Sequence, residues 1–172
     1  AGMNFPQINI ADDLFTSNSK RCIQICRGIV DSGIRARWSA FARVDTINPD
    51  LLRALVEAGC GDLCFGMESG NQDILDNCRK GITLEKSRNA VEMCRMAGIR
   101  AVASFILGLP GETAATMNDT IEFAGSLGIP YGYHILAPFP GSAVRQDAGR
   151  WGMAINTDDW DMYDADRAVC RY

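Results

Sequence analysis

Five short apolar runs, separated by segments with helical spacing, constrain the fold of this chain more than any other feature of its sequence. The runs, which we expect to be β-strands, are Phe5 to Ala11, Arg37 to Ala42, Leu63 to Met67, Val102 to Leu107 and Tyr133 to Phe139. Their centres lie 25 to 39 residues apart, close to the ~30 or more residues of one strand–helix–strand unit. The pattern predicts five parallel strands joined by helices.

The segments between the runs carry signals for helix ends. Asn48 followed by Pro49, and Thr83 followed by Leu84, are typical of helix starts. Gly98 stands where a left-handed residue would end a helix. Parallel strands with helical crossovers form either an open doubly wound sheet or a barrel. An eight-stranded barrel needs ~250 residues, so a chain of 172 residues predicts a partial (β/α) barrel of the TIM type.

The length and composition fit one globular domain. A domain typically takes ~150 residues, and a chain with 47% hydrophobic and 22% charged residues is not disordered. We expect βα repeats over residues 1–142, followed by a C-terminal helix and an acidic, aromatic tail over residues 143–172. The first predicted strand begins almost at residue 1, so we expect that the N-terminal part of a larger fold precedes it.

Charge and cysteine content exclude several classes of partner. A net charge of -4 disfavours a surface that binds nucleic acid nonspecifically. No apolar stretch approaches the ~20 residues that span a bilayer, and no secretory signal is evident. Seven cysteines in a chain without an export signal favour reduced thiols, and therefore a cytoplasmic location.

Polar and glycine-rich residues follow the predicted strands, where parallel α/β folds bind their ligands. Glu68 shares a strand face with Cys64 and Gly66, so we expect its carboxylate at the mouth of the barrel. A helix cap is the alternative for Glu68, as it is for Asp12 and Asp13 after the first strand. The turn from Gly108 to Gly111 would let backbone approach a ligand closely, although ordinary turns use glycine too.

The cysteines and the one histidine give no metal motif. Cys22 with Cys26, and Cys60 with Cys64, have CxxxC spacing, but the positions three residues further on hold Ile29 and Met67. We therefore predict that no cysteine ligates a metal and that most pack as small apolar groups. The single histidine, His134, lies on the last predicted strand, where a satisfied core side chain and a ligand contact are both open.

Read together and in order, the strand-end segments resemble the radical S-adenosylmethionine (SAM) superfamily, and more narrowly the branch whose members often carry an N-terminal cobalamin-binding domain. The matching segments are Asp12 to Thr16, Phe65 to Gly70, Lys80 to Glu85, Phe105 to Thr113 and Pro138 to Ser142. The resemblance implies strands two to six of the six-stranded partial barrel of that superfamily. The first unit, with the CxxxCxxC loop that holds a [4Fe-4S] cluster, would then come from the N-terminal remainder of the same polypeptide.

The resemblance also implies roles for residues of this chain. Glu68 and Ser69 match the position that binds the ribose of SAM. Asp12 and Asp13 fall where the superfamily often contacts the methionine ammonium, although the Gly-Gly-Glu usual at that point is absent. Lys80 would be a partner for the methionine carboxylate.

Two further segments would lie around the adenine. Gly108, Leu109 and Gly111 correspond to the segment after the fifth strand of the superfamily, beside the base. The backbone from Leu136 to Pro138 corresponds to the sixth strand, which lines it.

The implied activity is reductive cleavage of SAM at the cluster. The resulting 5′-deoxyadenosyl radical would abstract hydrogen from a small-molecule substrate, for methyl transfer or for oxidoreduction. These residues leave open whether cobalamin takes part, and this chain alone is expected to be inactive. The alternatives are a non-catalytic barrel scaffold and a barrel aldolase or lyase, which would need a strand-borne lysine that no predicted strand supplies.

Overall fold

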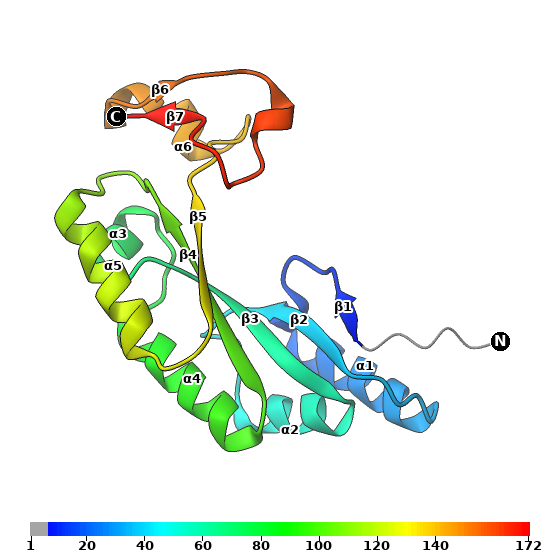
Figure 1. Cartoon of the computed structure of the whole chain (residues 1–172). Coiled ribbons are helices and arrows are strands. Elements are labelled where there is room, and N and C mark those ends of the chain that lie inside the picture. The colour runs from blue at the N-terminus through cyan, green and yellow to red at the C-terminus, as the bar shows by residue number, and fades with distance from the viewer. Residues whose placement is uncertain (1–6) are drawn as a thin grey trace.

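A curled parallel sheet forms the body of the molecule (Figure 1). The computed structural model describes residues 7–172. Five parallel strands lie in the order β1-β2-β3-β4-β5, so the predicted half-barrel with five parallel strands is confirmed. The strands are β1 (Ile8–Ile10), β2 (Trp38–Ala42), β3 (Cys60–Glu68), β4 (Arg100–Leu107) and β5 (Tyr131–Ile135). The helices between them are α1 (Ser19–Asp31), α2 (Pro49–Glu57), α3 (Gln72–Asn77), α4 (Leu84–Ala97) and α5 (Ala114–Ser126), with a short 3-10 turn, η1 (Phe15–Ser17), before α1.

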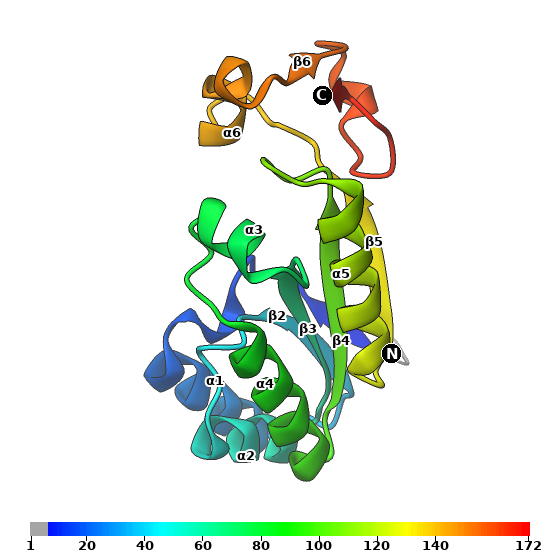
Figure 2. The ribbon, with the colours of Figure 1, turned by 90° about the vertical axis from the view of Figure 1, so that its left-hand side faces the viewer.

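The two faces of the sheet differ in burial. Helices α1, α2 and α4 lie on one side of the sheet (Figure 2), and the opposite, concave face is turned to the viewer in Figure 1. Along β3, the side chains of Leu63, Phe65 and Met67 are fully buried in the main hydrophobic core. The alternate residues Cys64 and Glu68 are only half-buried. The alternation therefore puts the core under the helices and leaves the concave face free to line a site.

The helix ends follow the predicted chemistry. The Asn48 side chain accepts a hydrogen bond from the Leu51 N–H at 3.0 Å, and the Thr83 hydroxyl accepts one from the Lys86 N–H at 3.2 Å. Gly98 ends α4 with φ 79°, a conformation that other residues rarely adopt. Local sequence therefore fixes where α2 and α4 begin and where α4 stops.

Most strand boundaries differ from the prediction by one to three residues, and the start of β3 and the end of β5 have clear physical reasons. β3 begins at Cys60, three residues earlier than predicted, because the charged Asp62 that interrupts the apolar run is buried in ion pairs rather than exposed. β5 ends at Ile135, so the predicted strand from Tyr133 to Phe139 is wrong in its second half. Beyond Ile135 the chain leaves the sheet, and Pro138 has no N–H to donate to a neighbouring strand. In the predicted first strand, residues 5 and 6 lie outside the described residues.

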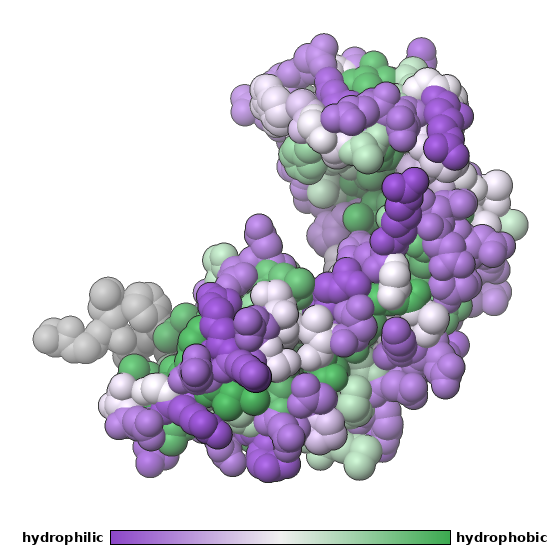
Figure 3. Space-filling model, turned by 180° about the vertical axis from the view of Figure 1, so that it is seen from behind, coloured by the Kyte–Doolittle hydropathy of each residue, from purple (hydrophilic) through white to green (hydrophobic). Residues whose placement is uncertain are grey.

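The segment after β5 folds as a small lobe above the barrel. Its elements are α6 (Ala143–Gln146), η2 (Ala148–Trp151), β6 (Ala154–Ile155), η3 (Trp160–Met162) and β7 (Cys170–Arg171), with β6 and β7 antiparallel. Only four residues of the predicted C-terminal helix form one, and the aromatic tail is partly packed, since Tyr163 is buried and Trp160 is exposed. The space-filling view shows this lobe set off from the body by a notch (Figure 3). Among residues 7–172, no helix combines the length and apolar character that crossing a membrane requires.

Candidate functional site

The predicted site residues gather at the carboxyl edge of the sheet, where the ends of the parallel strands meet. Glu68, the last residue of β3, is in register with Phe105 of β4. β4 ends at Leu107, so the Gly108 turn follows at the same edge. The structure therefore brings Glu68 and the Gly108 turn to one end of the barrel, as the strand-end rule requires.

Glu68 occupies an unusual backbone conformation. Its φ is 65°, in the left-handed region that glutamate rarely adopts. The Ser69 N–H donates to the Met67 carbonyl at 2.8 Å, so Glu68 is the central residue of a classic γ-turn, which is rare and strained. The register between β3 and β4 shifts at the same place. Strain of this kind persists where surrounding structure enforces it, and it concentrates at functional sites.

The Glu68 carboxylate is paired with Lys80, which lies in the loop between α3 and α4. The Lys80 Nζ is 2.5 Å from Glu68 Oε1, and the two side chains are 21% and 20% exposed. A Cβ added at Gly66 would lie 2.7 Å from the same Oε1, so glycine leaves the room that this pair occupies. Two residues that the sequence predicts for different parts of one ligand are therefore neighbours at the mouth of the barrel.

Ser69 is fully buried rather than exposed at the mouth. Its Oγ lies 3.1 Å from Thr120 Oγ1 of α5 and accepts a hydrogen bond from the Asn71 N–H at 3.1 Å. The Gly70 N–H donates to the same Thr120 hydroxyl at 3.0 Å, and a Cβ at Gly70 would lie 2.5 Å from Phe123. This contact anchors the turn after Glu68 to α5, and the ribose role of Ser69 stays a prediction.

Asp12 and Asp13 lie after the end of β1. Asp12 accepts a hydrogen bond from the Leu14 N–H at 3.1 Å and pairs with Arg21 of α1, also at 3.1 Å. Asp13 is exposed. The helix itself is capped by Asn18, not by either aspartate. The contacts recorded for Asp12 are local ones, and the ammonium role of both residues stays a prediction.

The Gly108 to Gly111 turn is closed by its own glutamate. One oxygen of Glu112 accepts the N–H groups of Gly108 at 2.6 Å and Leu109 at 3.0 Å. The other oxygen is buried, with no hydrogen-bond partner among the described residues. Burial raises the pKa of Glu112, and the two backbone N–H donors oppose that shift only in part. The Gly108 carbonyl accepts the Tyr172 hydroxyl at 2.7 Å and the Leu109 carbonyl accepts the Glu112 N–H at 3.0 Å, so both residues of the turn already have partners for their amides and carbonyls.

The Leu136 to Pro138 segment lies against the same turn. The Leu136 N–H donates to the Leu107 carbonyl at 2.9 Å, and Leu109 and Leu136 are buried together in a second hydrophobic cluster. The Pro138 carbonyl accepts a hydrogen bond from Arg145 at 3.2 Å. These two predicted segments are therefore joined, while His134 on β5 is exposed.

Arg43 and Asp45 have no predicted role, although both lie just after the end of β2. The Arg43 guanidinium donates to both oxygens of Asp45 at 2.9 Å and to the Lys80 carbonyl at 3.0 Å. The hydrogen bond from Arg43 holds the pKa of Asp45 below its usual value. The Arg-x-Asp spacing is the only local signal for this pair, because the contact to Lys80 spans 37 residues.

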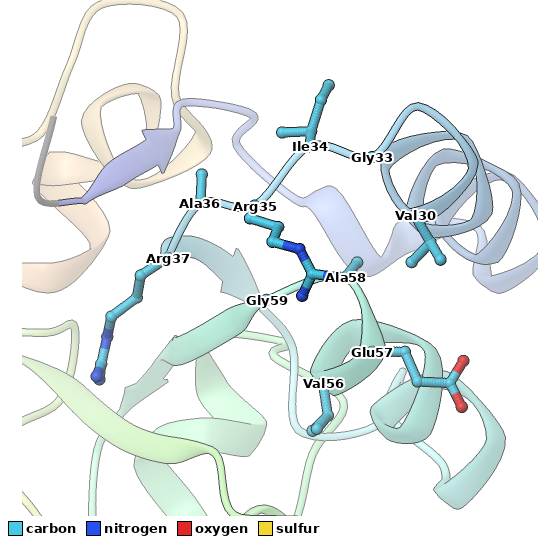
Figure 4. A pocket seen from close by; sticks show the side chains of 10 residues that line it. All are labelled: Val30, Gly33, Ile34, Arg35, Ala36, Arg37, Val56, Glu57, Ala58 and Gly59. Atoms are coloured by element: carbon cyan, nitrogen blue, oxygen red, sulfur yellow. The ribbon is translucent and has the colours of Figure 1, made fainter. Parts of the chain in front are cut away.

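A separate hollow lies at the opposite edge of the sheet (Figure 4). It has a volume of about 460 Å³ and is lined by Val30 at the end of α1, residues 33–37 before β2, and residues 56–59 at the end of α2. Because these segments precede or underlie the amino ends of the strands, the hollow is remote from Glu68 and contains no predicted site residue. We place the candidate site at the carboxyl edge on its chemistry.

Comparison with known proteins shows the family of this chain. Residues 5–124 match the radical SAM superfamily. The chain belongs to the radical SAM superfamily. It is 40% identical over 158 residues to an uncharacterized methyltransferase of Pyrococcus horikoshii, a match that covers 91% of this chain and 34% of that protein. It is 29% identical over 143 residues to the anaerobic magnesium-protoporphyrin IX monomethyl ester cyclase of Rubrivivax gelatinosus, covering 81% of this chain and 26% of the cyclase.

Solved structures of this superfamily share the fold. The radical SAM methyltransferase TsrM of Kitasatospora setae, determined with cobalamin and a [4Fe-4S] cluster bound, superposes with a TM-score of 0.75 at 22% identity. The match covers 90% of this chain and 31% of TsrM. The chain thus spans about a third of the length of these radical SAM relatives.

The two cofactors of radical SAM proteins fit the described residues differently. A carboxylate and an ammonium at the mouth suit the hydroxyls and the carboxylate of SAM. A [4Fe-4S] cluster needs thiolate ligands, but residues 7–172 hold no group of three His, Cys, Asp or Glu side chains arranged for a metal ion. Burial also raises the pKa of Cys60 and of Cys94 to about 12, which keeps both thiols protonated. The described residues therefore fit SAM and do not fit the cluster.

Proposed function

We propose that this chain forms the SAM-binding part of a radical SAM enzyme, with Glu68 as the central residue that binds SAM. The proposal rests chiefly on the Glu68–Lys80 pair at the mouth of the half-barrel. The Glu68 carboxylate can accept two hydrogen bonds from the ribose hydroxyls, and the Lys80 ammonium can donate to the methionine carboxylate. Binding SAM would exchange one internal ion pair for contacts to both ends of the ligand.

The other predicted residues take supporting roles in this proposal. The joined segments at Gly108 to Gly111 and Leu136 to Pro138 would flank the adenine. Ser69 would hold the Glu68 turn against α5, and its contact with the ribose stays a prediction. Asp12 and Asp13 would face the methionine ammonium from the end of β1.

The cluster would be held by a CxxxCxxC loop preceding Ala1 in the same polypeptide. The length of the relatives supports this, because the chain covers only 34% of the methyltransferase to which it is 40% identical. When bound, the cluster supplies the electron for reductive cleavage of SAM. A sequence of the whole protein without three such cysteines upstream would favour the scaffold alternative.

Methyl transfer to a small molecule is the reaction class we propose for the whole protein. Similar proteins include the methyltransferase of Pyrococcus horikoshii and the bacteriochlorophyllide d C-8(2)-methyltransferase of Chlorobaculum tepidum. The cyclase of Rubrivivax gelatinosus keeps radical oxidoreduction as the second candidate. An aldolase with a strand-borne Schiff base loses support, because the three lysines, Lys20, Lys80 and Lys86, all lie off the strands.

The decisive experiment measures SAM binding to the full-length protein, reconstituted with iron and sulfide without oxygen. We expect Glu68→Gln to weaken SAM binding about tenfold, the scale of one charge-assisted hydrogen bond, with an unchanged cluster absorbance. The matched control is Glu92→Gln, which removes an exposed carboxylate paired with Arg95 on α4. Its SAM affinity should equal that of the wild type.

Two outcomes would contradict the proposal. Equal SAM affinity for Glu68→Gln and the wild type would remove Glu68 from the site. A wild type that binds no SAM would favour the scaffold. With a reductant and SAM, 5′-deoxyadenosine in the products would support radical cleavage.

A further inference from the structure

Arg43 forms a two-pronged ion pair with Asp45 near the mouth of the barrel. It follows β2 directly, and its side chain is 31% exposed, against 24% for Asp45. Nε donates to Asp45 Oδ1 and Nη2 to Asp45 Oδ2, both at 2.9 Å. This two-pronged pairing fixes the plane of the guanidinium, which a single contact would not.

The same guanidinium holds the loop that carries Lys80. Arg43 Nη2 also donates to the Lys80 carbonyl at 3.0 Å. A second tether holds the far end of this loop, where the Gln72 amide donates to the Ile82 carbonyl at 3.1 Å and accepts the Leu84 N–H at 3.2 Å. Arg43 is therefore the tether on the β2 side, at the residue whose ammonium faces Glu68.

This tether matters most once a ligand has separated Lys80 from Glu68. In the free protein the Glu68 carboxylate itself helps to hold the Lys80 side chain. A ligand that takes Glu68 through hydroxyls breaks that ion pair but leaves the contacts of Arg43 intact. The Lys80 backbone is then held by Arg43 at its carbonyl and by its own N–H, which donates to the Leu75 carbonyl at 3.0 Å, while Gln72 holds the loop two residues further on.

We infer that Arg43 is a positioning residue that fixes the Lys80 ammonium where it receives the carboxylate of bound SAM, an inference that rests on the proposed function. Arg43 acts through Lys80 and on one end of the ligand only. Its loss should therefore weaken binding of compounds that carry the carboxylate and spare those that lack it. A general structural role would weaken both kinds of compound equally.

The test compares SAM with 5′-methylthioadenosine, which keeps the adenosine and sulfur but lacks the amino-acid part. Equilibrium dialysis would use the full-length protein with its cluster reconstituted. We expect Arg43→Lys to weaken SAM binding about tenfold and to leave 5′-methylthioadenosine binding within about twofold. The matched control, Arg53→Lys, alters an exposed Arg–Asp pair on α2 and should change neither affinity.

A second pair of variants isolates the route of action. Asp45→Asn should reproduce the selective loss, because it breaks the two-pronged pairing while keeping the shape of the side chain. In a Lys80→Met background, Arg43→Lys should cost no further SAM affinity, since the residue through which it acts is gone.

The outcomes separate this inference from the proposed function. If Glu68→Gln weakens SAM binding but Arg43→Lys does not, or if Arg43→Lys weakens both compounds equally, the role of Arg43 is overturned and the proposed function stands. If the wild type binds neither compound, both are overturned. Full additivity of Arg43→Lys and Lys80→Met would also contradict action through Lys80.

Discussion

Asp62 and Glu68 lie six residues apart on the same strand, and both carboxylates are paired with cations, yet they do different work. Asp62, near the amino end of β3, has a side chain only 6% exposed. It accepts hydrogen bonds from Gln7 at 3.0 Å and from Arg37 at 3.4 Å, and it also pairs with Arg100. Glu68, at the carboxyl end, has one cationic partner and a strained backbone. The Asp62 carboxylate, with hydrogen-bond partners on both oxygens, stabilises the amino end, or floor, of the half-barrel. The Glu68 carboxylate has a partner on one oxygen and can still accept hydrogen bonds from a ligand.

This contrast follows the general division of labour in parallel βα barrels. The amino-terminal edge of such a sheet stabilises the fold, and the carboxyl edge carries the chemistry. In β3 the two ends can be compared without any change of strand, face or neighbouring core. Substitutions at the two ends of β3, and at the buried Glu112 after β4, test this contrast.

Removing the floor carboxylate should have the largest effect on stability. We expect Asp62→Ala to lower the free energy of unfolding by about 2 kcal/mol, because it removes the carboxylate that Gln7, Arg37 and Arg100 share. Burial opposes ionisation of Asp62, but the hydrogen bond and charge of Arg100, with those of Arg37, outweigh it and lower its pKa. The stability that Asp62 contributes is therefore present above pH 3.8, its ordinary pKa, and is lost as the pH falls further.

Urea unfolding at neutral and acid pH would measure both parts of this prediction. Glu68→Gln is the matched change at the other end of β3, and it should cost less than about 1 kcal/mol. A larger stability loss for Glu68→Gln than for Asp62→Ala would reverse the assignment of the two ends.

The strain at Glu68 should show as an inverted preference between glycine and alanine. Alanine keeps the penalty of a left-handed backbone and glycine relieves it, so we expect Glu68→Gly to be about 1 kcal/mol more stable than Glu68→Ala. Both variants should lose SAM affinity. At Cys64, on the same face of β3 with ordinary strand geometry, alanine should be the more stable replacement by about 0.5–1 kcal/mol. If alanine were the more stable replacement at Glu68 as well, the backbone of Glu68 would carry no strain.

The smallest effect concerns Glu112 and has the opposite pH sign to that of Asp62. Because burial raises the pKa of Glu112, its contribution to stability is fully present below its ordinary pKa of 4.5 and is lost as the pH rises through the folded value. We expect the wild type to lose stability relative to Glu112→Gln over that range. Unfolding measured from pH 4 to pH 7 would test this, and parallel pH profiles for the two proteins would contradict it.

The sequence pattern predicts more of the fold than of the candidate site. Five apolar runs were enough to predict the five parallel strands of the sheet. Such runs are buried by the helices that lie before and after them in the sequence, so the alternation of strands and helices is visible as a periodic pattern. The start of β3 was predicted three residues too late, because a charged residue such as Asp62 is typical of a loop unless arginines pair with it inside a strand. The end of β5 was predicted too late, because the apolar Leu136 was counted as part of the strand. It is buried in the second hydrophobic cluster, beyond the end of the strand.

At the site, the strand-end rule put Glu68 at the carboxyl edge of the sheet, where the structure has it, but nothing in the sequence indicated how it is held. The positive φ at Glu68 runs against the local preference of glutamate, so only the surrounding packing can produce it. The resemblance assigned Ser69 to the ribose, and the sequence carried no sign that its side chain is buried against Thr120 of α5. The link from Arg43 to Lys80 is made to a backbone carbonyl, which carries no mark in the sequence.

The open edges of the sheet have a practical consequence for work with this chain. β1 is paired on one side only, through Ile8 and its neighbours to β2, and no strand covers its outer side among residues 7–172. Unpaired amides and carbonyls on such an edge are a template for another strand, and the Ile8 side chain beside them is 45% exposed. Residues 1–172 expressed in isolation are thus prone to self-association along β1, which charged substitutions at Ile8 would suppress.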